Sequence, residues 1–206
     1  MNHPLPDVYL VRHGETEWTL SGQHTGLTDL PLTSEGEEQA RDLRDRLKVT
    51  TFAKVFTSPL QRAVRTCELS GYGPVAQTDR DLVEWNYGDY EGRKRSQILA
   101  ERPDWLIFRD GCPNGESPQA VAIRADRVIS RVRHVDGSVL VFSSGHFLRV
   151  LIARWLGLEP FGGGYFKLGT ATLTILGFDH NKQAEPVIRL WKRCPSCKGN
   201  VAGINT

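Results

Sequence analysis

Apolar and polar residues alternate along this chain in blocks that predict strands and helices in turn. Short apolar runs bounded by polar turns are typical of buried strands, and apolar residues three and four positions apart are typical of a helix with one buried face. The expected strands are residues 8–11, 54–59, 138–144, 171–178 and 186–191. The expected helices are residues 33–48, 60–69, 96–102, 117–135 and 147–157.

Particular residues mark where these helices are expected to begin and end. Ser34 followed by Glu37 matches a capping box at the start of the first helix. Pro59 is expected in the first turn of the next helix, and Gly157 is expected to stop the last one. The two final strands are joined by a polar segment, which predicts a hairpin.

Alternating strands and helices predict an α/β fold of three layers, in which helices cover both faces of a mainly parallel mixed sheet. Active sites in such folds lie just beyond the carboxyl ends of the strands. We therefore expect the functional residues to follow Val11, Thr57 and Phe142. The 206 residues contain no repeat and no linker, which predicts a single domain over residues 1–206 with a flexible tail from about residue 194.

The composition and charge of the chain argue against some classes of binding partner. The net charge is +2 and the basic residues are scattered among acidic ones, so we expect no nucleic acid as a partner. No apolar run has the length of a bilayer span, and the first residues lack a secretory pattern. The sequence therefore predicts a cytoplasmic protein without a membrane partner, and a homodimer stays open.

The four cysteines suit a reducing compartment. Cys194 and Cys197 form a lone CPSC motif, a pattern that suits zinc or a redox pair. A zinc site needs two further ligands, and no second cysteine pair or histidine pair follows. Two incidental thiols are the favoured interpretation.

The residues best suited to catalysis or to binding an anion follow the ends of the expected strands. Arg12 and His13 follow the first strand, Arg62 follows the second, and His146 follows the third. Guanidinium groups match phosphate oxygens, so this set indicates a pocket for a phosphoryl group. Glu84 lies among glycine and aromatic residues, where partial burial would let it deliver a proton. Taken singly, Arg62 also suits a helix salt bridge and Glu84 a solvated loop.

Taken together, these motifs resemble the histidine phosphatase superfamily, the phosphoglycerate mutase-like proteins. The matching segments follow one another along nearly the whole chain: LVRHGETEW, LTDLPLTSEGEEQA, FTSPLQRAVRT, DLVEWNYGDYEG, DGCPNGES and SSGHFLRVLIARWLGL. The branch of sugar bisphosphatases typified by fungal sedoheptulose bisphosphatase is especially similar, as are bacterial acid phosphatases, in EWTLSGQHTGLTDLPLT and EWNYGDYEG. The resemblance implies a phosphoglycerate mutase-like fold and phosphohistidine chemistry.

The resemblance also implies roles for individual residues. His13 would accept the phosphoryl group while Arg12 and Arg62 hold its oxygens. Glu84 would protonate the leaving oxygen and later take a proton from the attacking water. Gly14 would let the backbone approach closely and orient the imidazole. No metal and no other cofactor is implied. The implied substrate-binding positions are Gly14, Thr19, Gln23, Thr25, Gly26, Tyr87, Ser144, Gly145 and His146.

The chain departs from the family pattern at two of these positions. Thr19 stands where asparagine is common, so its role is carried over only weakly. Most members place a second histidine before the glycine matched by Gly145, and this chain has Ser144 there. His146 follows the glycine, at the expected start of a helix, where a positive imidazolium is disfavoured. We expect His146 to line the substrate pocket without replacing the missing histidine.

The predicted function is that of a metal-independent, histidine acid phosphatase-type phosphomonoesterase for small phosphorylated metabolites, namely sugar phosphates or bisphosphates. Losing one donor at a developing oxyanion costs about 3 kcal/mol, so Ser144 implies a rate lower by roughly a hundred- to a thousandfold. Ser144 is also compatible with a change made to trap a ligand. Two alternatives stay open: mutase-type transfer, which the missing middle insertion and extended tail of true mutases disfavour, and a catalytically impaired phosphate-metabolite-binding protein.

Overall fold

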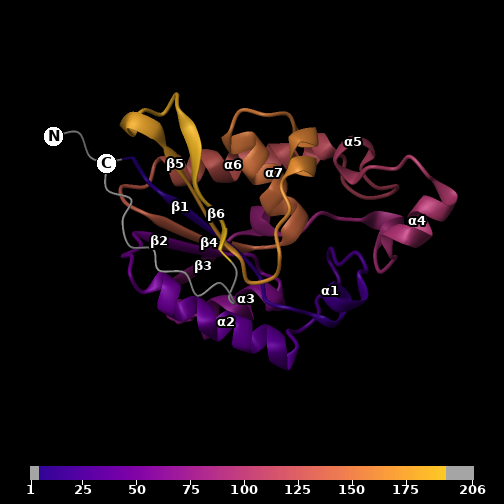
Figure 1. The fold of residues 1–206 in the computed structure, drawn as a ribbon, viewed down its shortest axis with the longest axis horizontal. Helices are drawn as coiled ribbons and strands as arrows, with labels where there is room; N and C mark the ends of the chain where they lie inside the picture. Colours follow the sequence, from indigo (N-terminus) through magenta and orange to yellow (C-terminus); the bar gives the residue numbers. More distant parts are fainter. Residues whose placement is uncertain (1–4, 194–206) are drawn as a thin grey trace.

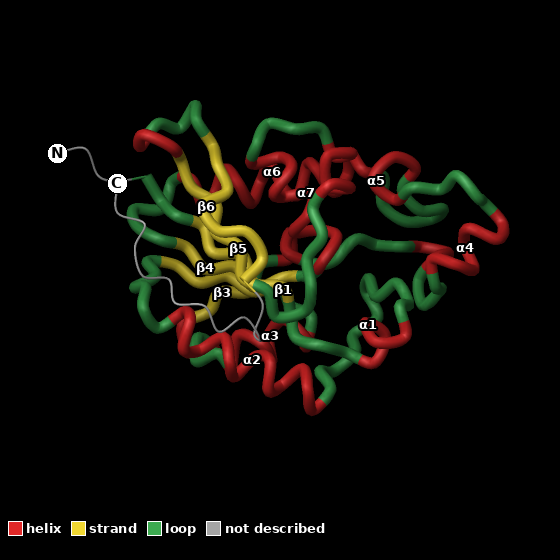
Figure 2. Tube along the Cα trace, viewed as in Figure 1, coloured by secondary structure: helices red, strands yellow, loops and turns green. Residues whose placement is uncertain are grey.

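The computed structural model describes residues 5–193 and contains a sheet of six strands between two layers of helices (Figures 1 and 2). The strand order is β3-β2-β4-β1-β5-β6. The first four strands in this order run parallel, and β5 and β6 are antiparallel to their neighbours. The expected mainly parallel mixed sheet is therefore confirmed. The strands are β1 Val8–Arg12, β2 Lys54–Thr57, β3 Ala76–Thr78, β4 Val139–Ser143, β5 Leu173–Phe178 and β6 Pro186–Arg193.

Helices α2 and α3 cover one face of the sheet, and α6 and α7 cover the other (Figure 1). The short helices α1, α4 and α5 lie to one side of the sheet, around the pocket described below. The elements that were not expected from the sequence are α1, α5, β3 and the 3-10 segments. The helices are α1 Glu17–Ser21, α2 Ser34–Leu47, α3 Gln61–Leu69, α4 Arg95–Glu101, α5 Ile107–Asp110, α6 Pro118–Arg133 and α7 Gly145–Trp155.

Two apolar clusters, one on each face of the sheet, form the core. Successive side chains of a strand point to opposite faces. In β4, Leu140 and Phe142 belong to the cluster that includes α2 residues, and Val139 and Val141 belong to the cluster with α6 and α7 residues. All five residues of β4 are buried, which explains why its sequence is a continuous apolar run without polar alternation.

Two of the expected helix starts are wrong. The N-cap of α2 is Thr33, whose hydroxyl oxygen accepts a hydrogen bond from the Gly36 amide at 3.0 Å, so Ser34 is the first helical residue. Pro59 lies outside α3, which begins at Gln61. A side chain from a distant segment satisfies the first amide of α3, because Gln61 N donates to Asp29 Oδ1 at 2.8 Å. This contact could not be predicted from the residues around Gln61, because its partner lies in a distant segment.

The last helix of the sequence analysis also begins earlier than expected. Helix α7 starts at Gly145, and only Ser144 separates it from the end of β4. Its expected stop is present, because Gly157 has a φ of +76° and follows the C-cap residue Leu156. The connection from strand to helix is thus a single residue, which places the start of α7 at the edge of the sheet.

Strands β1, β2 and β4 end at the same edge of the sheet. The register pairs Arg12 with Ser143, and Thr57 with Phe142. The residues that follow continue this pairing, because His13 N donates to Ser143 O at 3.0 Å and Ser58 N donates to Phe142 O at 2.9 Å. The segments that follow these three strands therefore lie side by side, at the carboxyl edge where α/β folds place their sites.

Two cysteines lie in the part of the chain that the structure describes, and both are buried thiols. Burial raises the pKa of Cys67 and of Cys112 to about 12, which keeps both protonated and unreactive at neutral pH. Cys194, Cys197 and the expected tail lie outside the described residues. Within residues 5–193, every helix is too short or too polar to cross a membrane.

Candidate active site

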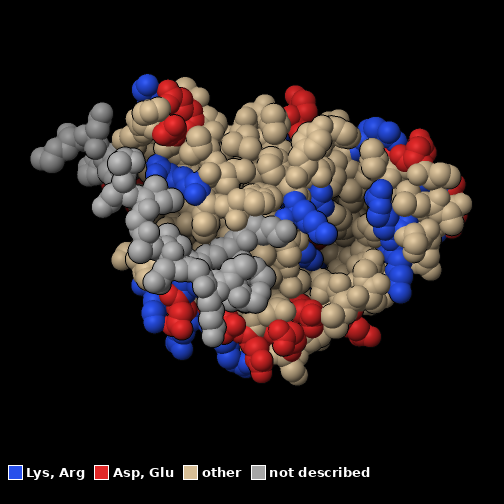
Figure 3. Space-filling view, viewed as in Figure 1, with Lys and Arg blue, Asp and Glu red and all other residues tan. Residues whose placement is uncertain are grey.

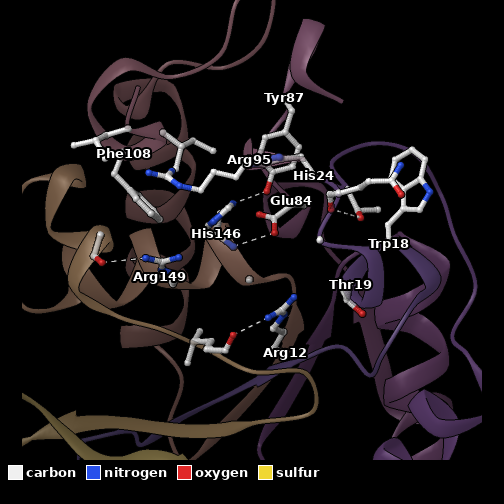
Figure 4. A pocket seen from close by; sticks show the side chains of 18 of the residues that line it. Arg12, Trp18, Thr19, His24, Glu84, Tyr87, Arg95, Phe108, His146 and Arg149 are labelled. Carbon is white, nitrogen blue, oxygen red and sulfur yellow. Dashed lines mark hydrogen bonds between the residues drawn. The ribbon is translucent and has the colours of Figure 1, made fainter. Parts of the chain in front are cut away.

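A pocket of about 620 Å³ opens beyond the carboxyl edge of the sheet (Figures 3 and 4). In the space-filling view it is a hollow with basic side chains along its walls (Figure 3). Nine of the residues expected from the sequence line it: Arg12, His13, Thr19, Gln23, Thr25, Glu84, Tyr87, Gly145 and His146. The other four do not line it: Gly14, Gly26, Arg62 and Ser144.

His13 follows β1 and is almost completely buried. Its Nδ1 lies 2.7 Å from the carbonyl oxygen of Gly14. A carbonyl only accepts hydrogen bonds, so Nδ1 carries the hydrogen, and Nε2 of the neutral ring keeps a free lone pair. Burial, reinforced by the positive charges of Arg62 and Arg12, holds the pKa of His13 well below its ordinary value of 6.5. The ring is therefore neutral and nucleophilic at neutral pH.

Gly14 allows β1 to pack closely against the start of α2. A Cβ atom at this position would lie 2.3 Å from the carbonyl oxygen of Gly36, closer than any side chain permits. The Gly14 amide donates to Thr66 Oγ1 on α3 at 3.0 Å. These contacts fix the peptide whose carbonyl orients the imidazole of His13.

Arg62 is fully buried on α3 and is held by the loop that precedes α2. Its Nη1 donates to Thr28 O at 2.9 Å, and its Nη2 donates to Gly26 O at 2.7 Å and Thr25 O at 3.2 Å. Carbonyl groups orient a guanidinium without neutralising its charge. A Cβ atom at Gly26 would lie 2.5 Å from a neighbouring carbonyl oxygen, so Gly26 serves this loop although it does not line the pocket.

Arg12 at the end of β1 is oriented in the same way, because its Nη1 donates to Leu168 O at 2.6 Å (Figure 4). The Nε atoms of Arg12 and Arg62 are both buried and lack a hydrogen-bond partner. Among residues 5–193, no carboxylate forms an ion pair with either guanidinium. Buried donors without partners are costly. An anion with several oxygens, such as a phosphoryl group, would satisfy them.

Glu84 is held at the N-terminus of α7 by three backbone amides. Oε1 accepts from Trp85 N at 2.8 Å and from Phe147 N at 2.8 Å, and Oε2 accepts from His146 N at 2.9 Å. The bonds from His146 and Phe147 satisfy amides that every helix start leaves free. Oε2 accepts only one amide, so it retains a lone pair on which a proton can be carried. The carboxyl group is thus fixed inside the pocket (Figure 4).

Ser144 does not act as a conventional cap for α7, although it occupies the N-cap position. Its side chain is completely buried, and its Oγ has no hydrogen-bond partner. Glu84 caps the helix instead, from a different segment of the chain. The position that matches the family's second histidine is therefore a buried hydroxyl group without a partner.

His146 lines the pocket as a neutral ring. Its Nδ1 lies 2.6 Å from the hydroxyl group of Tyr87 (Figure 4). Burial, followed by the positive charge of Arg149 and the neighbouring His24, holds the pKa of His146 well below 6.5. The expectation of an uncharged ring agrees with this geometry, but burial is the leading cause and not the helix terminus.

The loop after β1 uses its polar side chains mainly for its own folding. Thr19 Oγ1 accepts from Thr16 N at 2.9 Å and closes the capping box of α1. Gln23 Nε2 donates to Gly92 O at 2.8 Å, which ties this loop to the segment before α4. Thr19 and Gln23 therefore shape the pocket wall, and their hydrogen-bonding groups are already partly occupied.

Several pocket residues were missed by the sequence reasoning. Arg95 on α4 is a cation that makes no ion pair or hydrogen bond within residues 5–193, and its Cζ lies 5.8 Å from the centre of the Trp105 ring. The basic run RKR at 93–95 was the only signal for it. The remaining missed residues are apolar, aromatic or held by backbone contacts: Trp18, Gly22, His24, Leu106, Ile107, Phe108, Arg149, Phe161, Gly164, Tyr165 and Leu168.

Comparisons with known proteins find a family model, relatives and a solved structure that are similar to this chain. Residues 8–192 match the family model described as the histidine phosphatase superfamily (branch 1). The acid phosphatase of Mycobacterium tuberculosis is 39% identical over 194 residues, which cover 92% of this chain and 93% of the relative. The sedoheptulose 1,7-bisphosphatase of Saccharomyces cerevisiae is 39% identical over 187 residues, covering 74% of this chain and 68% of the relative. The solved structure of an open reading frame from Mycobacterium tuberculosis has a TM-score of 0.87 at 36% identity, covering 92% and 98% of the two chains.

Proposed function

Because the chain belongs to the histidine phosphatase superfamily, we propose that it is a metal-independent phosphomonoesterase that works through a phosphohistidine at His13. Homologues named as phosphatases support a phosphatase enzyme. One observation carries the finer proposal: a neutral His13 with a free Nε2 lies beside two buried arginines whose Nε atoms lack partners. This arrangement suits a nucleophile that receives a phosphoryl group.

In the first step, Nε2 of His13 attacks phosphorus and forms the P–N bond while the bond to the leaving oxygen breaks. Arg12 and Arg62 hold the phosphoryl oxygens and stabilise the charge that develops on them. Glu84 transfers its proton to the leaving oxygen, so the product departs as an alcohol. The three amides around Glu84 keep its carboxyl group in place during the transfer.

In the second step, Glu84 takes a proton from a water molecule, whose oxygen attacks phosphorus as the P–N bond breaks. Inorganic phosphate leaves, His13 returns to its neutral form, and Glu84 is protonated again. The described pocket contributes one carboxylate, Glu84, to this chemistry. The arginine cations supply the positive charge in the proposed mechanism, and no step requires a metal.

The proposed substrates are small phosphorylated metabolites, with sugar phosphates and bisphosphates foremost. The similarity to a sedoheptulose bisphosphatase supports this class. A second observation is Arg95, a pocket cation without a carboxylate partner in the described chain, which suits a second anionic group on the substrate. We keep the cytoplasm as the expected location, on the basis of the cysteine content.

Ser144 favours a second candidate function, a catalytically impaired protein that binds phosphorylated metabolites. The buried Oγ of Ser144 has no partner, and no second imidazole stands beside His13 at that position. An anion pocket with both arginines would persist without the catalytic contribution of the missing histidine.

The test is phosphate release from p-nitrophenyl phosphate, sedoheptulose and fructose bisphosphates and phosphoglycerates, by the parent and by His13→Ala. We expect release by the parent only, and a phosphoryl group on the His13 peptide after rapid quenching at high pH. A chelator is expected to leave the rate unchanged. Release that persists in His13→Ala would contradict the phosphohistidine. Release only after Ser144→His would favour the binding protein, and faster interconversion of phosphoglycerates than hydrolysis would favour a mutase.

A further inference from the structure

The mouth of the pocket carries an aromatic pair that the proposed reaction does not use. We infer that Phe161 and Tyr165 form a subsite for a flat aromatic ring in the leaving group, so that phosphate esters bearing such a ring are preferred substrates. This inference rests on the proposed phosphatase activity, and within the small phosphorylated metabolites it favours esters with an aromatic leaving group over the sugar phosphates. Both residues belong to the 3-10 segment η4, Pro160–Tyr165, and both line the same pocket as His13.

The aromatic pair and a third apolar side chain of the pocket are exposed to solvent. Phe161 is 43% exposed, Tyr165 is 73% exposed, and Leu106, which lines the same pocket, is 38% exposed. A single exposed apolar side chain is ordinary on a protein surface. Three at the mouth of one concave site are typical of a surface that binds an apolar group. We call Phe161, Tyr165 and Leu106 the apolar rim.

Backbone contacts hold the rim in place. Arg149 on α7 donates from Nε to Gly163 O at 2.9 Å and from Nη2 to Gly164 O at 3.1 Å. Its guanidinium lies 4.4 Å from the centre of the Phe108 ring. A Cβ atom at Gly163 would lie 2.8 Å from Phe108, so glycine is needed where η4 packs on this ring. The glycine-rich segment packs inward and carries an aromatic side chain on either side.

The same helix links the rim to the catalytic end of the pocket. The start of α7 donates the His146 and Phe147 amides to Glu84, and Arg149 fixes η4 from the next turn. The distance between the rim and the phosphoryl site is therefore set by a rigid element. Because the rim and His13 line the same pocket, we infer that a substrate with its phosphoryl group at His13 extends its leaving group toward the rim.

Ring geometry and chemistry favour an aromatic occupant over a sugar. The two rings lie 5.8 Å apart with an interplanar angle of 89°, which leaves a corner where a third ring can contact one face and one edge. Neighbouring pocket residues Ile107, Phe108 and Leu168 add apolar surface. Sugar hydroxyl groups need hydrogen-bond partners when buried, and the side chains of the rim offer only the hydroxyl group of Tyr165.

The test compares 2-phenylethyl phosphate with butyl phosphate, because both leaving groups are primary alcohols of similar reactivity. We expect the parent to show a kcat/KM about tenfold higher for the phenylethyl ester. Tyr165→Ala and Phe161→Ala are expected to lose most of that preference, because the rate on the phenylethyl ester falls much more than the rate on butyl phosphate. Ile123→Ala, which removes an exposed apolar side chain on α6 outside the pocket, is the control and is expected to change neither rate.

Calorimetry separates failure of the subsite from failure of the proposed reaction. 3-Phenylpropylphosphonate and pentylphosphonate, in which a CH2 group replaces the bridging oxygen of the two esters, are not hydrolysed, so their binding is measurable even in a protein that releases no phosphate. We expect 3-phenylpropylphosphonate to bind about tenfold more tightly than pentylphosphonate to the parent, and the two to bind with about equal affinity to Tyr165→Ala. Equal binding of the two ligands to the parent, or equal losses on both esters in the rim variants, would overturn the inference. Unchanged melting temperatures of the variants confirm that each one is folded.

Discussion

The ends of β1 and β4 lie side by side, and their sequences look alike. Each is followed by a glycine, Gly14 or Gly145, and each carries a histidine nearby. After β1, the ring of His13 is turned by a carbonyl group so that Nε2 is free. After β4, the ring of His146 is bound through Nδ1 to a tyrosine hydroxyl, and Ser144 occupies the position closest to the strand.

The difference shows that the two strand ends contribute by different means. In the proposed reaction the β1 end acts through a side chain, because the proposed nucleophile is the imidazole of His13. The β4 end acts through its backbone, because the amides of His146 and Phe147 hold Glu84 whatever their side chains are. The serine that stands at position 144 in place of the family's histidine therefore lacks a side-chain contribution to the proposed transition state, while Glu84, the proposed proton donor, keeps its place.

The largest expected effect comes from comparing His13→Ala with His146→Ala. We expect His13→Ala to lower kcat at least about a thousandfold, because the nucleophile is lost. His146→Ala keeps the amide that holds Glu84, so kcat is expected to fall by no more than about tenfold. Steady-state phosphate release measures both. Equal losses of kcat in His13→Ala and His146→Ala would show that the β4 end also acts through its imidazole. The proposed difference between the two strand ends would then be wrong.

The second largest expected change in kcat comes from restoring the histidine that the family pattern places at the position of Ser144. A second imidazole donor at the phosphoryl group is worth about 3 kcal/mol, so Ser144→His is expected to raise kcat by roughly a hundredfold. Ser144→Ala is the matched control and is expected to stay within about threefold of the parent, because Oγ has no partner to lose.

The buried site of Ser144 also sets a structural condition on this experiment. A larger side chain placed in a well-packed region costs typically about 1–3 kcal/mol of stability. Melting temperatures of both variants therefore accompany the rates. A folded Ser144→His without a rate increase would show that the β4 end lacks more than one side chain, while a hundredfold loss in Ser144→Ala would assign the hydroxyl group itself a catalytic role.

The sequence predicted the mainly parallel sheet and the edge that carries the site better than the details of the pocket. Apolar runs such as the one in β4 are local, and the parallel connections that they imply bring Arg12, His13 and Ser144 to one edge. The capping of α7 by Glu84 was not predictable, because 60 or more residues separate the two and no local pattern links them. The partner of His146 was hidden for the same reason: Tyr87 reaches it from a distant loop.

Removing the hydroxyl group of Tyr87 would test how the β4 end keeps His146 neutral and fixed. In Tyr87→Phe, the buried Nδ1 of His146 loses its partner at 2.6 Å, which is expected to lower the free energy of unfolding by about 1–2 kcal/mol. The rate of phosphate release is expected to change only a fewfold, since Glu84 keeps its amides. Denaturant unfolding gives the first quantity. A rate loss near that of His13→Ala would make Tyr87 part of the chemistry.

The smallest effect is a pH dependence of stability with opposite signs at two histidines. His146 has a folded pKa well below 6.5, so the unfolded chain binds the extra proton and stability falls as the pH drops below about 6.5. His180 is exposed on the β5–β6 hairpin, and its hydrogen bond to Glu185 raises its pKa. Its contribution is therefore present below about pH 6.5 and is lost as the pH rises through the folded pKa.

Two matched variants separate these contributions. His146→Asn is expected to reduce the decline in unfolding free energy between about pH 6.5 and pH 5 by up to about 1.4 kcal/mol per pH unit. His13 and His24, whose pKa values are also lowered, account for the slope that remains. His180→Asn is expected to remove a weaker dependence of the opposite sign. Urea unfolding at a series of pH values measures both, and an unchanged acid slope in His146→Asn would mean that folding does not change the proton affinity of this ring, contrary to its lowered pKa.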